Sequence, residues 1–181
     1  IIDNFYTNAM ETRNYILTQD FKVRGNYPGQ RTESHANEHL KNMIEGYISN
    51  FAGKITCWPT ENDSYNGAFQ YTTSCDRSWI HNDNCNNWAG VLYLTPNAPV
   101  TSGTGIYRFH DGTRNVDEAE ARGNKKIIDV NSQDYTKWEL VDRIGNVFNR
   151  LVLFNSKQYH ASQDYFGTNK ENGRLFQVFF F

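Results

Sequence analysis

Two patterns of hydrophobic positions divide the chain, predicting helices in its first third and strands after it. Between residues 40 and 51, apolar side chains recur every three or four residues, which places them on one face of a helix. Gly53 follows as the expected end of that helix. A shorter helix is predicted over residues 8–17, where Asn8 and Glu11 have the spacing of a capping box. We expect these helices to cover one face of a sheet.

From about residue 65 the pattern changes to short β-type runs separated by Gly, Asn, Asp and Pro. The predicted strands are 68–73, 78–82, 90–95, 105–109, 150–154, 158–162 and 175–180. Many short strands in one domain are typical of a sandwich or a barrel. Residues 113–126 are polar and without apolar periodicity, which favours a solvated loop over a helix, and residues 134–142 are expected to form one or two helical turns that carry Trp138.

The length of 181 residues is typical of a single domain, with a helical part at 1–64 and a β-rich core at 65–181. The net charge of −2 argues against a nucleic-acid partner bound through a basic face. No apolar run has the length of a membrane span, so no membrane partner is expected. Cys57, Cys75 and Cys85 are too few for a disulfide framework and form no CxxC pair, which predicts a reducing, cytoplasmic location.

The chain contains one H-x-D tripeptide, formed by His81, Asn82 and Asp83. In a strand, residues two apart point to the same face, so this imidazole and this carboxylate converge on one point. A third ligand must come from elsewhere, and His160, just after an apolar strand, is the best candidate. Two histidines and one carboxylate on one side of a metal ion leave its other positions open, which is the ligand set of non-haem Fe(II) oxygenases.

The other histidines have weaker patterns. His110 precedes Asp111 directly, so the two side chains would face opposite sides of a strand. His35 and His39 have helical spacing, but the residues between them do not complete an H-E-x-x-H motif. We interpret this pair as surface residues.

Further pieces stand in a recognisable order around the three candidate ligands. They are the V-L-Y-L run at 91–94, the Gly-rich stretch at 103–106, the R-x-x-x-F strand at 150–154 and Arg174 at the start of the last strand. This order, which extends from about residue 65 to residue 181, resembles the 2-oxoglutarate/Fe(II)-dependent dioxygenase superfamily, nearest to its prolyl-hydroxylase-like branch.

The resemblance implies an α+β, mainly β protein whose N-terminal helices pack on a jelly-roll barrel of the double-stranded β-helix, cupin-like type. It implies that His81, Asp83 and His160 bind Fe(II), and that Arg174 binds the distal carboxylate of 2-oxoglutarate. The implied reaction couples decarboxylation of 2-oxoglutarate by O2 to hydroxylation of a C–H bond. Because Asp83 supplies the carboxylate that related halogenases lack, hydroxylation is favoured over halogenation.

The chain departs from the family pattern after Arg174. Many members carry R-x-S, whereas Phe176 stands at the serine position here. A second donor to the co-substrate must then come from elsewhere, and Tyr71 and Thr73 are the candidates. For the substrate side we single out Arg31, in a basic, turn-rich segment that either covers the barrel mouth or connects to it, and Trp88. Core packing is the alternative role of Trp88.

Two other functions stay open. One is a cupin-like metalloenzyme that uses no 2-oxo acid, and the other is a jelly-roll module that binds a ligand without turnover. The substrate itself is not legible in the sequence: a peptidyl side chain, an amino acid and another small metabolite all fit.

Overall fold

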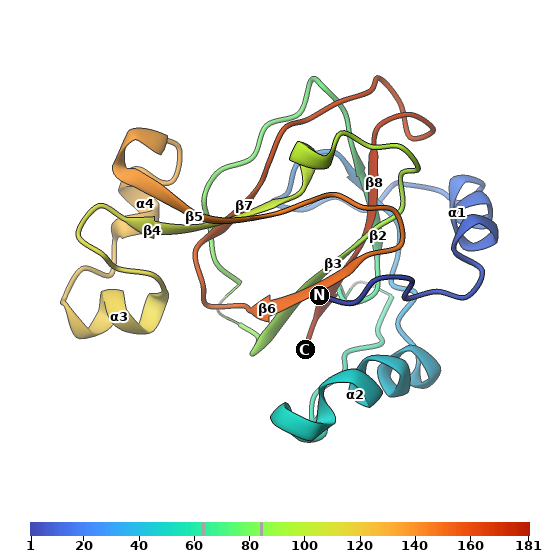
Figure 1. Ribbon diagram of the computed structural model, residues 1–181, viewed down its shortest axis with the longest axis horizontal. Helices are drawn as coiled ribbons and strands as arrows, with labels where there is room; N and C mark the ends of the chain where they lie inside the picture. Colours follow the sequence, from blue (N-terminus) through green and yellow to red (C-terminus); the bar gives the residue numbers. More distant parts are fainter. Residues whose placement is uncertain (63, 84) are drawn as a thin grey trace.

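The computed structural model describes residues 1–62, 64–83 and 85–181, in which two antiparallel sheets are flanked by a few helices (Figure 1). The larger sheet has the strand order β1-β2-β8-β3-β6 and the smaller one has the order β5-β4-β7. The protein is therefore mainly β, as predicted. The strands of the larger sheet, in that order, are Gln30–Arg31, Phe69–Thr72, Arg174–Phe180, Trp88–Tyr93 and Leu151–Asn155, and those of the smaller sheet are Trp138–Ile144, Thr104–Phe109 and His160–Ser162.

Both predicted N-terminal helices are present. Helix α1 comprises Ala9–Leu17 and helix α2 comprises Glu38–Ala52. Helix α2 begins after Asn37, whose side chain accepts a hydrogen bond from the main-chain N–H of Leu40, and ends at Gly53, where φ is 76°. The chain also forms two short α-helices and two 3₁₀ turns: α3 (Val116–Ala121), α4 (Ile127–Asn131), η1 (Val100–Ser102) and η2 (Tyr135–Lys137).

One hydrophobic cluster joins the N-terminal helices to the outer face of the larger sheet. Ile16 of α1 and Ile44 of α2 are almost completely buried against it. The sheet contributes residues from four strands, which are Phe69, Leu92, Leu151, Leu175 and Phe179. In Figure 1, α1 and α2 lie along the side of the molecule away from α3 and α4. The apolar stripe predicted along α2 is thus the surface that covers the sheet.

The inner faces of the two sheets enclose a second cluster. Along β8, alternate side chains face opposite sides: Leu175 and Phe179 join the outer cluster, whereas Phe176 and Val178 face inward. Ile106 and Ile144 of the smaller sheet complete the inner cluster. Packing of two inner faces over a shared core is the arrangement of a β-sandwich or a flattened barrel.

Two predictions of secondary structure are wrong. Residues 78–82 form no strand, because His81 alone makes an isolated bridge there, with His160. Residues 134–142 form one 3₁₀ turn, η2, after which the chain enters β5 at Trp138. Strand β5 is a sheet edge that buries only its two ends, Trp138 and Ile144, so its exposed middle has no alternating apolar signal.

Two local predictions also fail. The stretch 113–126 contains helix α3, which Asn115 caps by accepting from the N–H of Glu118 and which buries Ala119. The first part of this stretch is therefore packed on the protein, and only residues 120–126 are solvent-exposed throughout. At α1, the side chain of Asn8 makes no capping hydrogen bond, so the predicted capping box is absent. Among the described residues, no helix is long and apolar enough to cross a bilayer.

Candidate metal centre

His81 and His160 are direct partners across two antiparallel segments. The main-chain N–H of His81 donates to the carbonyl of His160 at 3.0 Å, and that of His160 donates to the carbonyl of His81 at 2.9 Å. Residues paired in this way carry their side chains on the same face. The two rings accordingly lie 4.3 Å apart, centroid to centroid, at an angle of 53°.

Asp83 brings a carboxylate to the two imidazoles. Its main-chain N–H donates to the carbonyl of Ser156 at 2.7 Å, in the turn between β6 and β7, which holds the H-x-D segment against the start of β7. One ligand atom from each of His81, Asp83 and His160 lies within 4.8 Å of the others. No other group of His, Cys, Asp and Glu in the described parts of the chain has this arrangement, so His35, His39 and His110 belong to no such cluster.

Main-chain carbonyls orient both rings. Nδ1 of His81 lies 2.9 Å from the carbonyl oxygen of Trp79, and Nδ1 of His160 lies 2.9 Å from that of Gln158. Because a carbonyl oxygen only accepts, we assign the ring proton to Nδ1 in both histidines. Each neutral ring then has its lone pair on Nε2, and this second hydrogen bond is the one that commonly orients metal-binding histidines.

The contact between His160 and Asp83 requires a positive charge. Nε2 of His160 lies 3.2 Å from Oδ2 of Asp83. With the ring proton on Nδ1, both of these atoms are acceptors, so either a second ring proton or a cation must lie between them. The donor set of two imidazoles and one carboxylate fits Fe(II) and leaves coordination positions open.

The electrostatics favour the protonation states that a metal site needs. Burial and the neighbouring His160 lower the pKa of His81 to about 4, which keeps its ring neutral. Burial of Asp83 works to raise its pKa, but the contact with Nε2 of His160 and the nearby His81 and Arg31, whose cationic forms favour the carboxylate, lower it on balance. A neutral imidazole and an ionised carboxylate are the forms that bind metal.

A cavity of about 180 Å³ opens at the three candidate ligands. Inner-face residues of the larger sheet form one wall, and the segments around Tyr27 and Tyr65 form another. The cavity lining includes Tyr27, Arg31, Tyr65, Gln70, Thr104 and Phe176. The candidate metal centre therefore lies beside a space that a small molecule, or part of a larger one, can enter.

Arg174 is completely buried at the inner face of β8 and has no carboxylate partner among the described residues. Its Nε donates to the carbonyl of Ser102 at 2.8 Å and its Nη2 donates to that of Gly103 at 3.3 Å, but Nη1 has no partner. The ring of Phe176 lies 4.3 Å from the guanidinium carbon, and Phe176 lines the cavity whereas Arg174 does not. Burial lowers the pKa of Arg174, as expected for a cation without a counter-ion.

Three of the predicted contacts lie elsewhere. Tyr71 faces the outer cluster, where its ring meets Phe21 at 5.1 Å. Thr73 lies in the turn after β2, and its N–H and hydroxyl both donate to the carboxylate of Asp76. Trp88 also faces the outer cluster and stacks on Phe181, so its core-packing alternative is the observed one. These residues do not line the cavity, because they lie on the wrong face of their strands or beyond the strand end.

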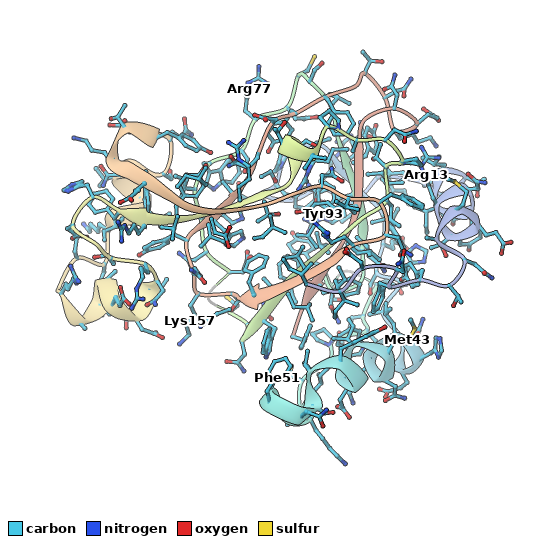
Figure 2. The ribbon with its side chains drawn as sticks, in the orientation of Figure 1. Arg13, Met43, Phe51, Arg77, Tyr93 and Lys157 are labelled. Atoms are coloured by element: carbon cyan, nitrogen blue, oxygen red, sulfur yellow. The ribbon has the colours of Figure 1, made fainter. Side chains whose placement is uncertain are left out.

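Sequence reasoning missed Thr72, Tyr93 and Tyr165. Thr72 lies directly opposite Arg174 between β2 and β8, and its buried hydroxyl has no partner. The buried hydroxyl of Tyr165 is unpartnered too. Tyr93, which Figure 2 shows in the interior, shares a 2.7 Å hydrogen bond with Thr104 and lies beneath the same guanidinium. Side chains alternate between the two faces of a strand, so the position of Tyr93 in the V-L-Y-L run was the sequence signal that it points inward.

No protein-family model matches the chain, and no curated protein matches its sequence. Its structure is similar to that of HygX from Streptomyces hygroscopicus, solved with nickel and 2-oxoglutarate bound. That comparison has a TM-score of 0.58 and 11% identity, and it covers 98% of this chain and 79% of HygX. HygX with nickel, 2-oxoglutarate and hygromycin B gives a TM-score of 0.59 at 10% identity, with the same shares covered.

A prolyl hydroxylase from Trichoplax adhaerens, solved with a peptide of the hypoxia-inducible factor oxygen degradation domain, is also similar. The TM-score is 0.52 at 15% identity, over 99% of this chain and 81% of the hydroxylase. Sequence identities this low establish a shared fold but not a shared function. The resemblance found in the sequence is thus confirmed in fold: the chain is built like a 2-oxoglutarate-binding protein and a prolyl hydroxylase.

Proposed function

We propose that this protein is a 2-oxoglutarate- and Fe(II)-dependent oxygenase that hydroxylates a C–H bond. The observation that carries the proposal is the convergence of His81, Asp83 and His160 on one point beside a cavity. When bound there, Fe(II) supplies open positions for a 2-oxo acid and O2, and with them the oxidising chemistry. The carboxylate of Asp83 occupies the position that a halide needs in a halogenase, which favours hydroxylation.

We further propose that the two sheets form a double-stranded β-helix, and that residues 1–181 are one domain. The strand pairings β2-β8-β3-β6 and β5-β4-β7, together with the similarity to HygX and to the prolyl hydroxylase, support the barrel. The outer cluster supports the single domain, because it contains residues of α1 and α2 together with residues of four strands. We propose a cytoplasmic location because the chain has few cysteines.

Arg174 and Thr72 are the proposed anchors of the distal carboxylate of 2-oxoglutarate. Nη1 of Arg174 and the hydroxyl of Thr72 are both buried and unpartnered, and the two residues are directly paired across β2 and β8. A buried guanidinium without a counter-ion is costly, and a bidentate carboxylate relieves that cost. In this arrangement the Thr72 hydroxyl takes the place of the serine that Phe176 replaces.

Phe176 favours one alternative, a cupin-like metalloenzyme that uses no 2-oxo acid. Its ring lies against Arg174 and borders the cavity, so a carboxylate reaches the guanidinium only if the ring turns aside. If the ring stays in place, the metal centre would work without a co-substrate anchored at Arg174.

Consumption of 2-oxoglutarate tests the proposal. The purified protein should decarboxylate 2-oxoglutarate only with Fe(II) and O2 present, slowly without substrate and faster with it. Asp83→Ala should abolish this consumption, whereas His39→Ala, an exposed histidine on α2, should leave it unchanged. Arg174→Met should raise the KM for 2-oxoglutarate by about tenfold or more, because one charge-assisted pair is lost. Turnover that is unchanged in Arg174→Met would support the cupin-like alternative.

A further inference from the structure

A second buried guanidinium, that of Arg31, lines the cavity, and the proposed reaction does not use it. Arg31 follows Gln30 in β1 and is only 4% exposed. Its Nε donates to Oε1 of Gln70 at 2.9 Å, and its Nη2 donates to the same oxygen. No carboxylate lies within ion-pair distance of Arg31 among the described residues. This cation is therefore paired with a neutral amide alone.

Aromatic rings hold the Arg31 guanidinium in place. Its carbon lies 3.7 Å from the ring centre of Tyr27 and 4.7 Å from that of Tyr65, and the two rings meet edge to face. The hydroxyl of Tyr27 donates to the carbonyl of Val23 at 2.7 Å, which fixes the first ring. The planar guanidinium of arginine stacks on aromatic faces better than the ammonium of lysine does.

The rings of Tyr27 and Tyr65 are closely packed against the neighbouring backbone. A Cβ atom at Gly25 would collide with the Tyr65 hydroxyl and lie 2.5 Å from the Tyr27 ring, so the chain has a glycine where a side chain would displace both. Nε2 of Gln70 donates to the carbonyl of Pro28 at 2.6 Å, which turns the Gln70 oxygen toward Arg31. The guanidinium is thus oriented before any ligand arrives, as in preorganised binding sites.

The Arg31 side chain shares its cavity with the candidate metal centre. Arg31, Tyr27 and Tyr65 line the same cavity as His81 and Asp83. Asp83 acts on Arg31 electrostatically, but it is committed to the metal centre and makes no ion pair with it. Burial lowers the pKa of Arg31 to about 10, so the group is still charged at neutral pH. One positive charge in the cavity wall is left without an anion.

We propose that Arg31 binds a carboxylate of the substrate, and that the oxidised substrate is therefore a carboxylic acid or a peptide with an acidic side chain. A planar carboxylate matches the planar guanidinium edge that Gln70 leaves open. The inference rests on the proposed function, since it takes the metal centre as the place where that substrate is oxidised. It narrows the substrate class to anions in which the carboxylate and the reacting C–H bond are close enough to fit into this one cavity.

Benzoate and benzamide are suitable probes, because they have nearly the same shape and differ in charge. We would load the protein with Zn(II), saturate it with 2-oxoglutarate, and follow the Nε–Hε NMR signal of Arg31 during titration. Benzoate should shift this signal saturably, and benzamide should not. Arg31→Lys should weaken benzoate binding by about tenfold or more, because lysine loses the planar fork and the ring contacts.

Two further variants keep the test decisive. Arg24→Lys changes an exposed cation in the same segment and should bind benzoate like the unchanged protein. Gly25→Ala keeps Arg31 but displaces its aromatic rings, so benzoate should bind more weakly even if Arg31→Lys fails to fold. Benzamide binding as tightly as benzoate, or benzoate binding equally in all variants, would overturn the inference.

Other outcomes separate this inference from the proposed function. If 2-oxoglutarate displaces benzoate from Arg31, then Arg31 anchors the co-substrate, and the inference about the substrate is wrong. If 2-oxoglutarate never binds the Fe(II) form while benzoate still requires Arg31, the proposed function falls and with it the claim that the anion is oxidised. If both ligands bind at the same time, the result supports both the inferred substrate class and the proposed oxygenase function.

Discussion

His81 and His160 exchange two main-chain hydrogen bonds, and this pairing places their imidazole rings 4.3 Å apart. The candidate metal centre is therefore assembled by a backbone pairing between segments far apart in sequence. Asp83 joins it through its own main-chain bond to Ser156. The geometry of the candidate ligands thus depends on the same contacts that hold the β7 end of the smaller sheet.

A bound divalent metal should stabilise the folded protein. At a free metal concentration one hundred times Kd, mass action contributes about 2.7 kcal/mol. For a domain of this size, that corresponds to a rise in Tm of about 5 to 11 °C. Calorimetry with Ni(II), which is redox-stable in air, measures the shift before and after chelation. His160→Ala should lose the rise and His39→Ala should retain it; an equal rise in both would place the metal elsewhere.

Thr72→Val should separate co-substrate binding from stability. The buried hydroxyl of Thr72 has no partner in the protein, so replacing it by a methyl group should leave the free energy of unfolding unchanged or raise it. The affinity for 2-oxoglutarate should fall by roughly threefold to tenfold, as for one lost hydrogen bond to a charged group. Urea unfolding and equilibrium titration measure the two effects. A loss of stability with unchanged affinity would remove Thr72 from the proposed anchor.

Helix α2 should unfold together with the two sheets. Ile44 is fully buried against the larger sheet, so Ile44→Ala should lower the free energy of unfolding by about 2 to 5 kcal/mol. Tyr47, on the same helix, is 49% exposed, and Tyr47→Ala should cost well under that amount. Tryptophan fluorescence and far-UV circular dichroism should report one common transition. Two separate transitions would contradict the proposed single domain.

Two glycines should respond to alanine in opposite directions. Gly29 has a φ of +75° and an added Cβ would overlap the carbonyl of Tyr71, so Gly29→Ala should destabilise by more than about 1 kcal/mol. Gly46 lies within α2 with open space around it, so Gly46→Ala should stabilise by roughly 0.5 to 1 kcal/mol. Thermal unfolding of both variants checks the turn that leads into β1 and Arg31; destabilisation by Gly46→Ala would contradict the placement of α2.

Much of this architecture was predictable from periodicity, because the apolar stripe of α2 and the inner strands carry strong signals. The three candidate ligands were predictable from residue type and order. The prediction placed a strand through His81, whereas the structure has a single isolated bridge there. The convergence comes instead from the long-range pairing with His160, which no local pattern encodes.

The proposed second anchor, Thr72, could not be identified from the sequence. Tyr71 and Thr73 were predicted, and the structure places Thr72, between them, opposite Arg174. Side chains alternate along a strand, so an error of one position moves a residue to the other face of the sheet. The apolar pattern of β2 does not decide the face, because three of its four residues, Phe69, Gln70 and Thr72, are buried.

The visible spectrum of the anaerobic Fe(II) protein with 2-oxoglutarate tests the central claim most directly. A 2-oxo acid bound through two oxygens to Fe(II) gives a metal-to-ligand charge-transfer band. The account predicts this band in the unchanged protein and in His39→Ala, and its loss in His160→Ala. A folded protein that binds Fe(II) but shows no band on addition of 2-oxoglutarate would contradict it.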